Sequence, residues 1–315
     1  MRTRRLGRTG LNVSVISLGS WLTFGGSVGE EETLGCIRRA FDLGVNLFDT
    51  ANVYERGGAE EVLGRALAPL PRAQYLVATK VFGEMGPAPD DRGLGERHVR
   101  AQCDASLRRL GIDVIDLYQC HRYDADTPLE ETCLVMDELV HAGKIRHWGV
   151  SEWSPAQMEA AVELCERGSL TPPSTDQPRY SMLERANEVE VLPACASLGL
   201  GVLAFSPLAQ GVLSGKYRSP EDLPPGSRAS TRSGAGFVAR FLTPQHLTRV
   251  ARLRPIADEH GVPLARLAIA WTLRRPEVTT AIVGASRVSQ VDENVAASEL
   301  ELDGSTLARI EQALA

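Results

Sequence analysis

Four side chains that can transfer or stabilise protons lie at the ends of three consecutive strand-like segments. Asp49 ends the segment NLFDT, and Tyr54 follows it by five residues. Lys80 lies near the end of YLVATKV, and His121 ends VIDLYQCH. Because the carboxyl ends of consecutive parallel strands are neighbours in a β/α barrel, we expect the four side chains to share one cavity.

Each of these residues, taken alone, also has a purely structural explanation. Asp49 can cap a turn, Lys80 can be a solvated strand end, and Tyr54 can cover the barrel mouth as a loop aromatic. His121 can be a core histidine whose hydrogen bonds are satisfied. Their joint placement at neighbouring strand ends is what favours chemistry.

The four side chains together have the chemistry of a tuned proton donor. A tyrosine phenol has a reference pKa of about 10, which is too high for ready proton loss at neutral pH. An ammonium about 4 Å away would stabilise the phenolate by up to about 4 kcal/mol at an effective dielectric constant of about 20. This stabilisation would lower the pKa of Tyr54 by up to about two to three pH units. Asp49 would keep Lys80 charged, and His121 would orient a substrate carbonyl toward Tyr54.

Strand-like and helical segments alternate along nearly the whole chain. Runs typical of buried strands occupy residues 15–19, 46–50, 75–81, 114–121, 145–151, 174–178, 201–207 and 279–286. Amphipathic helical patterns occupy residues 31–43, 59–70, 96–110, 129–142, 156–167, 187–198, 263–275 and 288–298. Capping residues are expected at several helix ends: Ser154 before Pro155 at a start, and Gly44, Gly111, Gly168 and Gly199 at ends.

Eight such pairs in a chain of 315 residues favour an α/β protein with a closed parallel (β/α)8 TIM barrel over an open sheet. The turn after the first strand, GSWLTFGGSVG, lacks the G-x-G-x-x-G of open dinucleotide-binding sheets. We expect residues 5–15 to form an N-terminal β-hairpin that plugs the barrel floor. Residues 208–242 form the longest irregular segment, and loops of this length are usually functional or disordered.

The composition argues against several classes of protein. A net charge of −6 disfavours a nucleic-acid binder, which needs a basic face. No run of about 18 apolar residues occurs, so no membrane-spanning helix is expected. The six cysteines are scattered without a CxxC pair, which predicts reduced, mostly buried residues in a cytoplasmic protein. Neither the cysteines nor the six histidines have zinc-ligand spacing, so no metal is expected.

The sequence resembles the aldo-keto reductase superfamily over nearly its full length. LFDTANVY matches the Asp-x4-Tyr signature of the family, VATKV carries its lysine, and DLYQCHR carries its histidine. The segments KIRHWGVSEWS, FSPLAQGVLSGKY, SRAS and IVGASRVSQVDEN follow the family pattern in order. The chain looks most like the branch that contains the β subunits of voltage-gated potassium channels and their bacterial relatives, because of WLTFGG, SPLAQGVLSGKY and a short C-terminal tail.

The resemblance implies one (β/α)8 barrel domain over residues 1–315 and NADPH-dependent reduction of an aldehyde or ketone. Asp49, Tyr54, Lys80 and His121 would form the catalytic tetrad. The hydride would come from C4 of the nicotinamide, and the proton from Tyr54 as general acid. The implied partner is a small-molecule carbonyl substrate, with no nucleic acid and no membrane span, and a homo-oligomer is left open.

The resemblance also assigns residues to NADP(H). Ser151 and Gln177 would bind the nicotinamide carboxamide, and Phe205 would stack on the ring, although a strand-end cap for Gln177 and barrel core for Phe205 are structural alternatives. Residues 208–211 would offer backbone donors to the pyrophosphate, and a helix start at residues 284–286 would attract phosphate. The expected cofactor contacts are Ser20, Trp21, Asp49, Ser151, Gln177, Phe205, Ser206, Pro207, Leu208, Gln210, Gly211, Lys216, Arg228, Gly284, Ser286, Arg287, Gln290, Glu293 and Asn294.

Within that set, the resemblance divides the adenosine end of the cofactor between two groups. Ser286, Arg287 and Gln290 would meet the 2′-phosphate, and Glu293 and Asn294 would meet the adenine. Because a guanidinium pairs well with a dianionic phosphate, Arg287 favours NADPH over NADH.

The expected substrate wall is aromatic, which favours an apolar or aromatic carbonyl compound, although each ring can equally be rim packing. It comprises Trp21, Tyr54, Phe82, His121 and Trp153, with Tyr123 as an alternative to Trp153.

Two positions depart from the pattern of the branch. The channel subunits carry asparagine at the position of His121 in this chain. At the position of Glu152 in this chain, other members of the branch often have arginine. The histidine favours a working reductase over the alternative, an NADP(H)-binding redox-sensing or regulatory subunit with weak reductase activity. A barrel hydrolase ranks lower, because it needs paired carboxylates and Asp49 is the only clear one.

Overall fold

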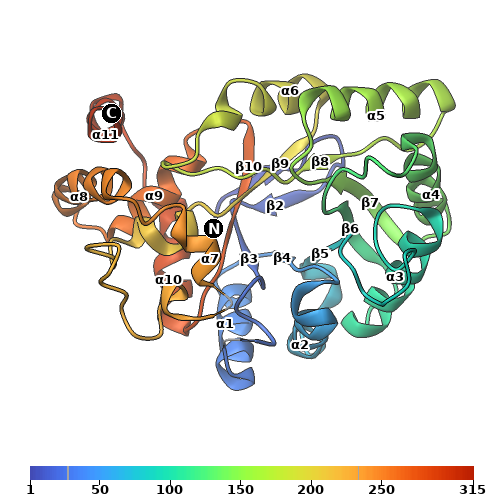
Figure 1. Cartoon of the computed structure of the whole chain (residues 1–315), viewed down its shortest axis with the longest axis horizontal. Helices are drawn as coiled ribbons and strands as arrows, with labels where there is room; N and C mark the ends of the chain where they lie inside the picture. The colour runs from blue at the N-terminus through green and yellow to red at the C-terminus, as the bar shows by residue number, and fades with distance from the viewer. Residues whose placement is uncertain (27, 233) are drawn as a thin grey trace.

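Eight parallel strands close into a barrel, as predicted. In the computed structural model, which describes residues 1–26, 28–232 and 234–315, the ring order is β10-β3-β4-β5-β6-β7-β8-β9 (Figure 1). The strands are β3 (Ile16–Gly19), β4 (Leu47–Asp49), β5 (Leu76–Val81), β6 (Ile115–Cys120), β7 (Ile145–Val150), β8 (Thr175–Asp176), β9 (Gly201–Phe205) and β10 (Val278–Val283). Each overlaps one predicted segment. Ser27 in GSWLTFGGSVG and Ser233 in the segment 208–242 lie outside the described residues.

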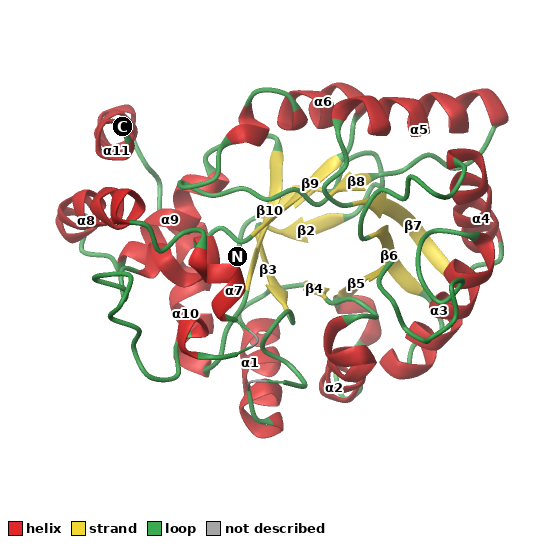
Figure 2. Cartoon of the chain, in the orientation of Figure 1, coloured by secondary structure: helices red, strands yellow, loops and turns green. Residues whose placement is uncertain are grey.

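Helices surround the ring of strands (Figure 2). Those that overlap the predicted segments are α1 (Glu30–Asp42), α2 (Gly58–Leu67), α3 (Glu96–Leu110), α4 (Leu129–His141), α5 (Pro155–Gly168), α6 (Val191–Leu198), α9 (Leu264–Leu273) and α10 (Val288–Val295). Short 3-10 turns are η1 (Tyr54–Gly57), η2 (Arg72–Gln74), η3 (Ala186–Glu188), η4 (Ala209–Ser214), η5 (Arg228–Ser230) and η6 (Ala296–Glu299). The helices expected over 187–198 and 288–298 are shorter than predicted, because η3 precedes α6 and η6 follows α10.

Three further helices were not predicted: α7 (Ala235–Ala239), α8 (Pro244–Glu259) and α11 (Gly304–Leu314). α8 and α11 pack against each other outside α9, at the edge of the molecule (Figure 1). Both begin with a side-chain cap: the Thr243 hydroxyl accepts a hydrogen bond from the His246 N–H, and the Asp303 carboxylate accepts one from the Thr306 N–H.

The predicted helix caps are largely present. Ser154 forms a capping box with Gln157 ahead of Pro155 at the start of α5. Gly111 and Gly199 end α3 and α6 in the left-handed conformation, and Gly44 follows the end of α1 with φ of 85°. The prediction for Gly168 was wrong, because it lies inside α5 and Ser169 takes the left-handed position with φ of 55°.

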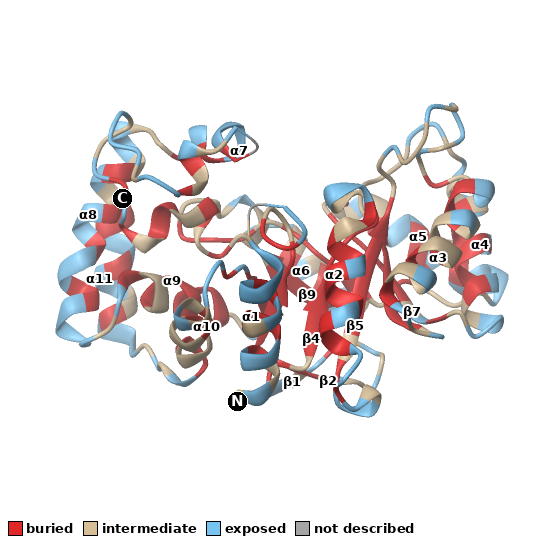
Figure 3. Ribbon diagram, turned by 90° about the horizontal axis from the view of Figure 1, so that it is seen from below, coloured by how far each residue is buried: buried red, intermediate tan, exposed pale blue. Residues whose placement is uncertain are grey.

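The predicted N-terminal hairpin is present and plugs one end of the barrel, although it begins at Thr3, two residues before its predicted start. β1 (Thr3–Arg5) and β2 (Asn12–Ser14) pair antiparallel. Leu6 and Val13 are buried in one cluster with barrel residues such as Leu117. Gly7 has φ of +50°, and a Cβ there would lie 2.5 Å from the backbone nitrogen of Gly201, so this close approach requires glycine. Figure 3 shows the hairpin at one end of the molecule and α7 at the other.

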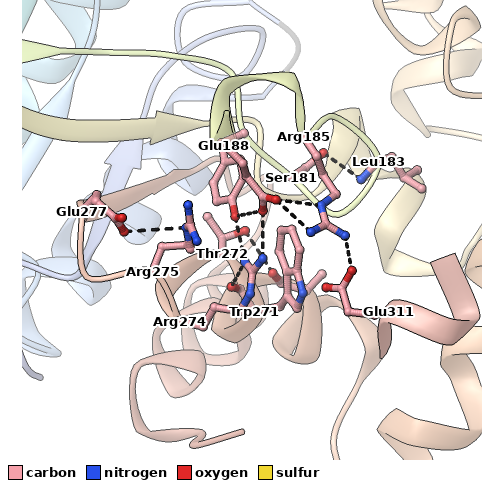
Figure 4. Close-up of polar contacts among 12 residues, drawn as sticks. Ser181, Leu183, Arg185, Glu188, Trp271, Thr272, Arg274, Arg275, Glu277 and Glu311 are labelled. Atoms are coloured by element: carbon pink, nitrogen blue, oxygen red, sulfur yellow. Dashed lines mark hydrogen bonds and ion pairs between the residues drawn. The ribbon is translucent and has the colours of Figure 1, made fainter. Parts of the chain in front are cut away.

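The chain between β8 and α6 is fastened by a network of charged side chains (Figure 4). Glu188 accepts hydrogen bonds from Tyr180 at 2.5 Å, Arg185 at 2.8 Å and Arg274 at 2.8 Å. Arg185 also pairs with Glu311 of α11. Burial alone would raise the pKa of Glu188, but these donors lower it to about 2. The network therefore ties this connection to α9 and to the C-terminal helix.

Candidate active site

Asp49, Tyr54 and His121 line one cavity, and Lys80, which is fully buried outside the lining, contacts Asp49 and Tyr54. Lys80 Nζ donates hydrogen bonds to Asp49 Oδ1 at 2.7 Å and to the carbonyl oxygen of Thr50 at 2.7 Å. Tyr54 Oη lies 3.5 Å from Lys80 Nζ and 3.5 Å from His121 Nε2. The structure thus brings the four predicted side chains together.

The strands position three of these side chains by their alternation. Asp49 is the last residue of β4, Lys80 is the last but one of β5, and His121 follows β6. Successive side chains on a strand face opposite sides, so Asp49 lies on the same inner face as Leu47, which is buried in the barrel cluster. On β4, an apolar residue, Leu47, is therefore followed on the same face by the polar Asp49 at the carboxyl end of the strand.

A tight turn positions the phenol. Tyr54 begins η1, and the next two residues, Glu55 and Arg56, have φ of 48° and 52°. Left-handed conformations are uncommon for residues other than glycine, and two in succession cost energy that the surrounding packing must offset. Residue 57 is a buried glycine with φ of 98°, which completes the turn into α2.

Burial and neighbouring charges set the protonation of the site. Burial raises the pKa of Tyr54 by more than the charge of Lys80 lowers it, so the expectation of a pKa below the usual value is wrong in this structure. Burial would lower the pKa of Lys80, but Asp49 and Tyr54 raise it, so the amine stays an ammonium. Burial lowers the pKa of His121 most, and the charges of Lys80 and Arg122 lower it further, so that it lies well below its usual value. At neutral pH the site therefore holds a protonated phenol, an ammonium and a neutral imidazole.

A cavity of about 620 Å³ opens above these groups. Eleven of the residues predicted for the tetrad, cofactor or substrate line it: Trp21, Asp49, Tyr54, His121, Ser151, Gln177, Phe205, Ser206, Gln210, Arg228 and Gly284. Gln177 donates from Nε2 to Asp49 Oδ2 at 2.9 Å, and Ser151 Oγ donates to the carbonyl oxygen of Gln177 at 2.9 Å. These hydrogen bonds orient the two side chains predicted to meet a nicotinamide carboxamide.

Comparison with known proteins identifies the family to which this chain belongs. Residues 15–315 match the family model described as Aldo/keto reductase family. The chain belongs to this family. It is 41% identical over 303 residues to the probable voltage-gated potassium channel subunit beta of Arabidopsis thaliana, covering 95% of this chain and 92% of the relative. It is 35% identical over 324 residues to the L-glyceraldehyde 3-phosphate reductase of Escherichia coli (strain K12), covering 100% of this chain and 93% of the relative. As an aldo/keto reductase, the chain is an NADP-dependent oxidoreductase.

The remaining residues predicted for the cofactor lie outside the cavity lining. They are Ser20, Pro207, Leu208, Gly211, Lys216, Ser286, Arg287, Gln290, Glu293 and Asn294. Ser20 is buried and donates to Thr50 Oγ1 at 2.9 Å, so its hydroxyl supports the strand end. Around the start of α10, Gln290 accepts from the Ser286 N–H at 2.9 Å, and Asn294 donates to the carbonyl oxygen of Gly284 at 3.3 Å.

Two aromatic residues predicted for the substrate wall of the reductase lie elsewhere. Trp153 is only 2% exposed and packs edge-on against Tyr123, with 4.9 Å between ring centroids. Phe82 packs against the core. Neither belongs to the cavity lining, nor does Tyr123. Glu152, with φ of 59°, turns the chain after β7, so Trp153 points into the core instead of the cavity.

The sequence reasoning missed several residues that line the cavity of this aldo/keto reductase. They are Gly19, Leu22, Val53, Glu55, Arg122, Arg179, Gly236, Phe237, Arg240 and Ile282. Phe237 of α7 packs edge-on against Trp21 at 4.7 Å between ring centroids and supplies aromatic wall that Trp153 does not. Arg179 was detectable in principle, because it lies two residues beyond Gln177 and so on the same face.

Glu152 holds Arg179 in place. One carboxylate oxygen of Glu152 accepts a hydrogen bond from the Arg179 N–H at 2.9 Å, and the other lies 2.7 Å from the guanidinium Nε. The same guanidinium lies 5.6 Å from the centroid of the Phe205 ring. The glutamate that departs from the branch pattern therefore binds a cavity arginine of the same chain.

Neither a metal-binding cluster nor a membrane-spanning helix occurs in the described part of the chain. Among residues 1–26, 28–232 and 234–315 there is no group of three or more side chains suited to hold a metal ion. In the same part of the chain, every helix is too short or too polar to cross a membrane.

Proposed function

We propose that this chain reduces an aldehyde or a ketone to the alcohol, with a hydride from NADPH and a proton from Tyr54. The observation that carries the proposal is the position of the phenol oxygen, 3.5 Å from both the Lys80 ammonium nitrogen and the His121 imidazole nitrogen. A carbonyl oxygen bound above the cavity floor would be within reach of both Tyr54 and His121.

The positive side chains near the cavity fit a cofactor with several phosphates. Lys216, Arg228 and Arg287 make no ion pair with any carboxylate of the described residues. Burial lowers the pKa of Lys216, and the charges of Arg228 and Arg287 lower it further, so both guanidinium groups lie close enough to repel the Lys216 ammonium. A Cβ at Gly211 would lie only 3.4 Å from Lys216 Nζ. A bound polyphosphate would supply the negative charge that this cluster lacks.

NADPH, when bound, supplies the hydride that reduces the carbonyl carbon. Tyr54 donates its proton to the carbonyl oxygen, which it can do at neutral pH because its raised pKa keeps the phenol protonated. The Lys80 ammonium stabilises the phenolate that remains, and Asp49 keeps that ammonium charged. A proton from solvent then restores the phenol.

His121 positions the substrate in this scheme. Because its imidazole is neutral, it carries one ring N–H, which can donate a hydrogen bond to the carbonyl oxygen. A charged imidazolium beside Lys80 would place two cations together, which burial of both groups disfavours. The histidine therefore orients the carbonyl, and the tyrosine protonates it.

A second candidate is an NADP(H)-binding regulatory subunit with weak reductase activity. It is supported by the names of the relatives described as potassium channel subunits. The presence of His121 next to Tyr54 supports the reductase instead. Both candidates bind NADP(H), but only the reductase is expected to reduce carbonyl compounds efficiently.

The test is to measure both properties on one preparation. NADPH binding is followed by the change in nicotinamide fluorescence, and turnover by loss of nicotinamide absorbance with nitrobenzaldehydes, phenanthrenequinone and methylglyoxal. A working reductase binds NADPH and consumes it with at least one carbonyl compound. Tight binding without turnover on any of them would favour the regulatory subunit, and absence of binding would contradict both.

We also propose that the protein works in a reducing compartment, the cytoplasm. All six cysteines are buried and free of disulfides. Disulfides form and persist in oxidising compartments, so this pattern supports a reducing one.

A further inference from the structure

Four arginines line the cavity, and three of them have side-chain partners. Arg179 pairs with Glu152 at 2.7 Å, and Arg240 pairs with Glu184 at 2.8 Å. Arg228 donates to Gln210 at 2.5 Å and lies 5.6 Å from the ring centroid of Trp21. These three guanidinium groups are held in the resting site.

Arg122 differs from the other three. Its hydrogen bond is to the carbonyl oxygen of the adjacent His121, at 2.5 Å from Nη1. Within residues 1–26, 28–232 and 234–315 it forms no ion pair with a carboxylate. A guanidinium carries five N–H donors, so most of the donors of this half-buried side chain remain available to a ligand.

The position of Arg122 places it on the substrate side of the site. It directly follows His121 at the end of β6, and its charge acts on both His121 and Tyr54. The cations assigned above to the cofactor phosphates follow β9 and β10 instead. β6 and β10 lie opposite each other in the ring (Figure 2), so the cofactor cluster and Arg122 flank the cavity from different sides.

The cavity lining as a whole carries more positive than negative charge. Its carboxylates are Asp49, which is paired with Lys80, and Glu55, which lies exposed at the rim. The whole chain, in contrast, has a net charge of −6. A positive cavity in an acidic protein attracts and orients anionic ligands.

We propose that the site selects carbonyl compounds that carry an anionic oxyacid group, a carboxylate or a phosphate, and that Arg122 binds this group. The proposal rests on the proposed reductase function and names its substrate class. The planar fork of a guanidinium matches the oxygens of a carboxylate or phosphate in two parallel hydrogen bonds. His121 and Tyr54 hold the carbonyl oxygen at one end of the substrate, while Arg122 holds the anion at the other.

The first arm of the test compares substrates that differ only in charge. The pairs are 4-carboxybenzaldehyde with its methyl ester, and glyceraldehyde 3-phosphate with glyceraldehyde. We expect the wild-type protein to have a higher kcat/KM for the anion than for its neutral partner in at least one pair. Which pair shows this preference tells whether the site binds a carboxylate or a phosphate. This preference should shrink as salt is added.

The second arm uses variants of Arg122. Arg122→Gln should lower kcat/KM for the preferred anion by about 10- to 100-fold, mainly through KM, as expected for hydrogen bonds to a charged group. Its kcat/KM for the neutral partner should fall by a smaller factor, so that the preference for the anion shrinks. Arg122→Lys should rescue part of the loss, because it keeps the charge without the fork. Arg108→Gln, at an exposed residue of α3 outside the cavity, makes the same change in net charge and should leave the preference intact.

A binding measurement separates this inference from the proposed function. Benzoate and inorganic phosphate are titrated calorimetrically into the NADPH-bound protein, which needs no turnover. Weaker binding of one of them to Arg122→Gln than to Arg108→Gln supports the anion site even if no aldehyde is reduced. Two results would contradict the anion site and leave the proposed reductase function intact. In the first, the wild-type protein reduces neutral aldehydes and shows no preference for the anion. In the second, Arg122→Gln loses kcat/KM equally for both substrates of a pair.

Discussion

The carboxamide of Gln177 donates a hydrogen bond of 2.9 Å to Asp49 Oδ2, while Asp49 Oδ1 accepts one of 2.7 Å from Lys80. Asp49 ends β4 and Gln177 directly follows β8, and these strands lie opposite each other in the ring (Figure 1). One buried carboxylate thus links a proposed nicotinamide contact with the ammonium beside the proposed proton donor. The charge of Lys80 and the orientation of Gln177 depend on the same group.

Asp49→Asn should therefore reduce both the free energy of unfolding of the protein and the pKa of the Lys80 ammonium. Without the carboxylate, burial lowers the pKa of Lys80, and the ammonium that stabilises the Tyr54 phenolate is lost at lower pH. Breaking a buried ion pair costs about 3 kcal/mol of unfolding free energy or more. Urea unfolding and the pH dependence of kcat measure the two effects.

The matched control for this substitution is Asp258→Asn, at an exposed residue of α8. It makes the same chemical change without touching a buried pair, so both properties should stay near those of wild type. An Asp49→Asn protein with the unfolding midpoint and pH profile of the control would show that Asp49 is not the partner on which Lys80 depends.

Tyr54→Phe should abolish most carbonyl reduction and leave the cofactor site intact. Loss of a general acid typically costs about 10²- to 10⁴-fold in rate. NADPH affinity should stay within about three-fold, because the phenol oxygen hydrogen-bonds only with Lys80 and His121 among the described residues. Steady-state kinetics and fluorescence titration are the measurements, and Tyr75→Phe, before β5 at the far end of the barrel, is the control. Unchanged turnover in Tyr54→Phe would rule out the proton-donor role.

The barrel and the convergence of the four polar side chains could be predicted from the sequence for one physical reason. Alternation along a strand and the closure of eight parallel strands together dictate which residues share the cavity. Asp49, Lys80 and His121 end three strands that are neighbours in the ring, so their convergence follows from topology alone. α8 and α11 could not be predicted in this way, because they pack on each other outside the β/α repeat.

Other features depend on three-dimensional detail that a sequence does not carry. Trp153 was expected in the substrate wall, but the left-handed conformation of Glu152 turns it into the core. The raised pKa of Tyr54 depends on how deeply the phenol is buried, and Lys80 alone would have lowered it. Arg122 was overlooked beside His121, because a lone arginine at a strand end is usually solvated and only the structure shows that it lacks a carboxylate partner.

Arg287→Ala should weaken binding of NADPH much more than binding of NADH. Arg287 lies at the start of α10, donates to Ser289 Oγ at 3.0 Å and acts on Lys216, so it extends the proposed phosphate cluster. We expect the Kd for NADPH to rise by about 10- to 100-fold, as for loss of hydrogen bonds to a charged group, and the Kd for NADH to change by less than about three-fold. Fluorescence titration with each cofactor measures this. The exposed Arg167→Ala on α5 is the control, and an equal loss for both cofactors would contradict a contact with the 2′-phosphate.

His121→Asn should flatten the dependence of stability on pH in the acid range. Burial, Lys80 and Arg122 hold the pKa of His121 well below its usual value of about 6.5, so the folded protein does not bind a proton that the unfolded chain binds. The stability that neutral His121 contributes is therefore complete above about pH 6.5 and is lost as pH falls below it, with a slope of up to about 1.4 kcal/mol per pH unit. Asparagine cannot titrate, so this slope should disappear from the variant. His98 and His147, whose pKa values burial also lowers, leave a residual slope in both proteins.

Urea unfolding at a series of pH values from about 7 down to about 5 measures the difference between the two slopes. The control is His141→Asn, because the His141 side chain is 71% exposed and, among the described residues, its ring contacts only Asp137, one turn earlier in α4. That variant should keep the wild-type slope. If His121→Asn kept it as well, His121 would not be the half-buried neutral group described, and its proposed role as a hydrogen-bond donor to the carbonyl oxygen would lose its physical basis.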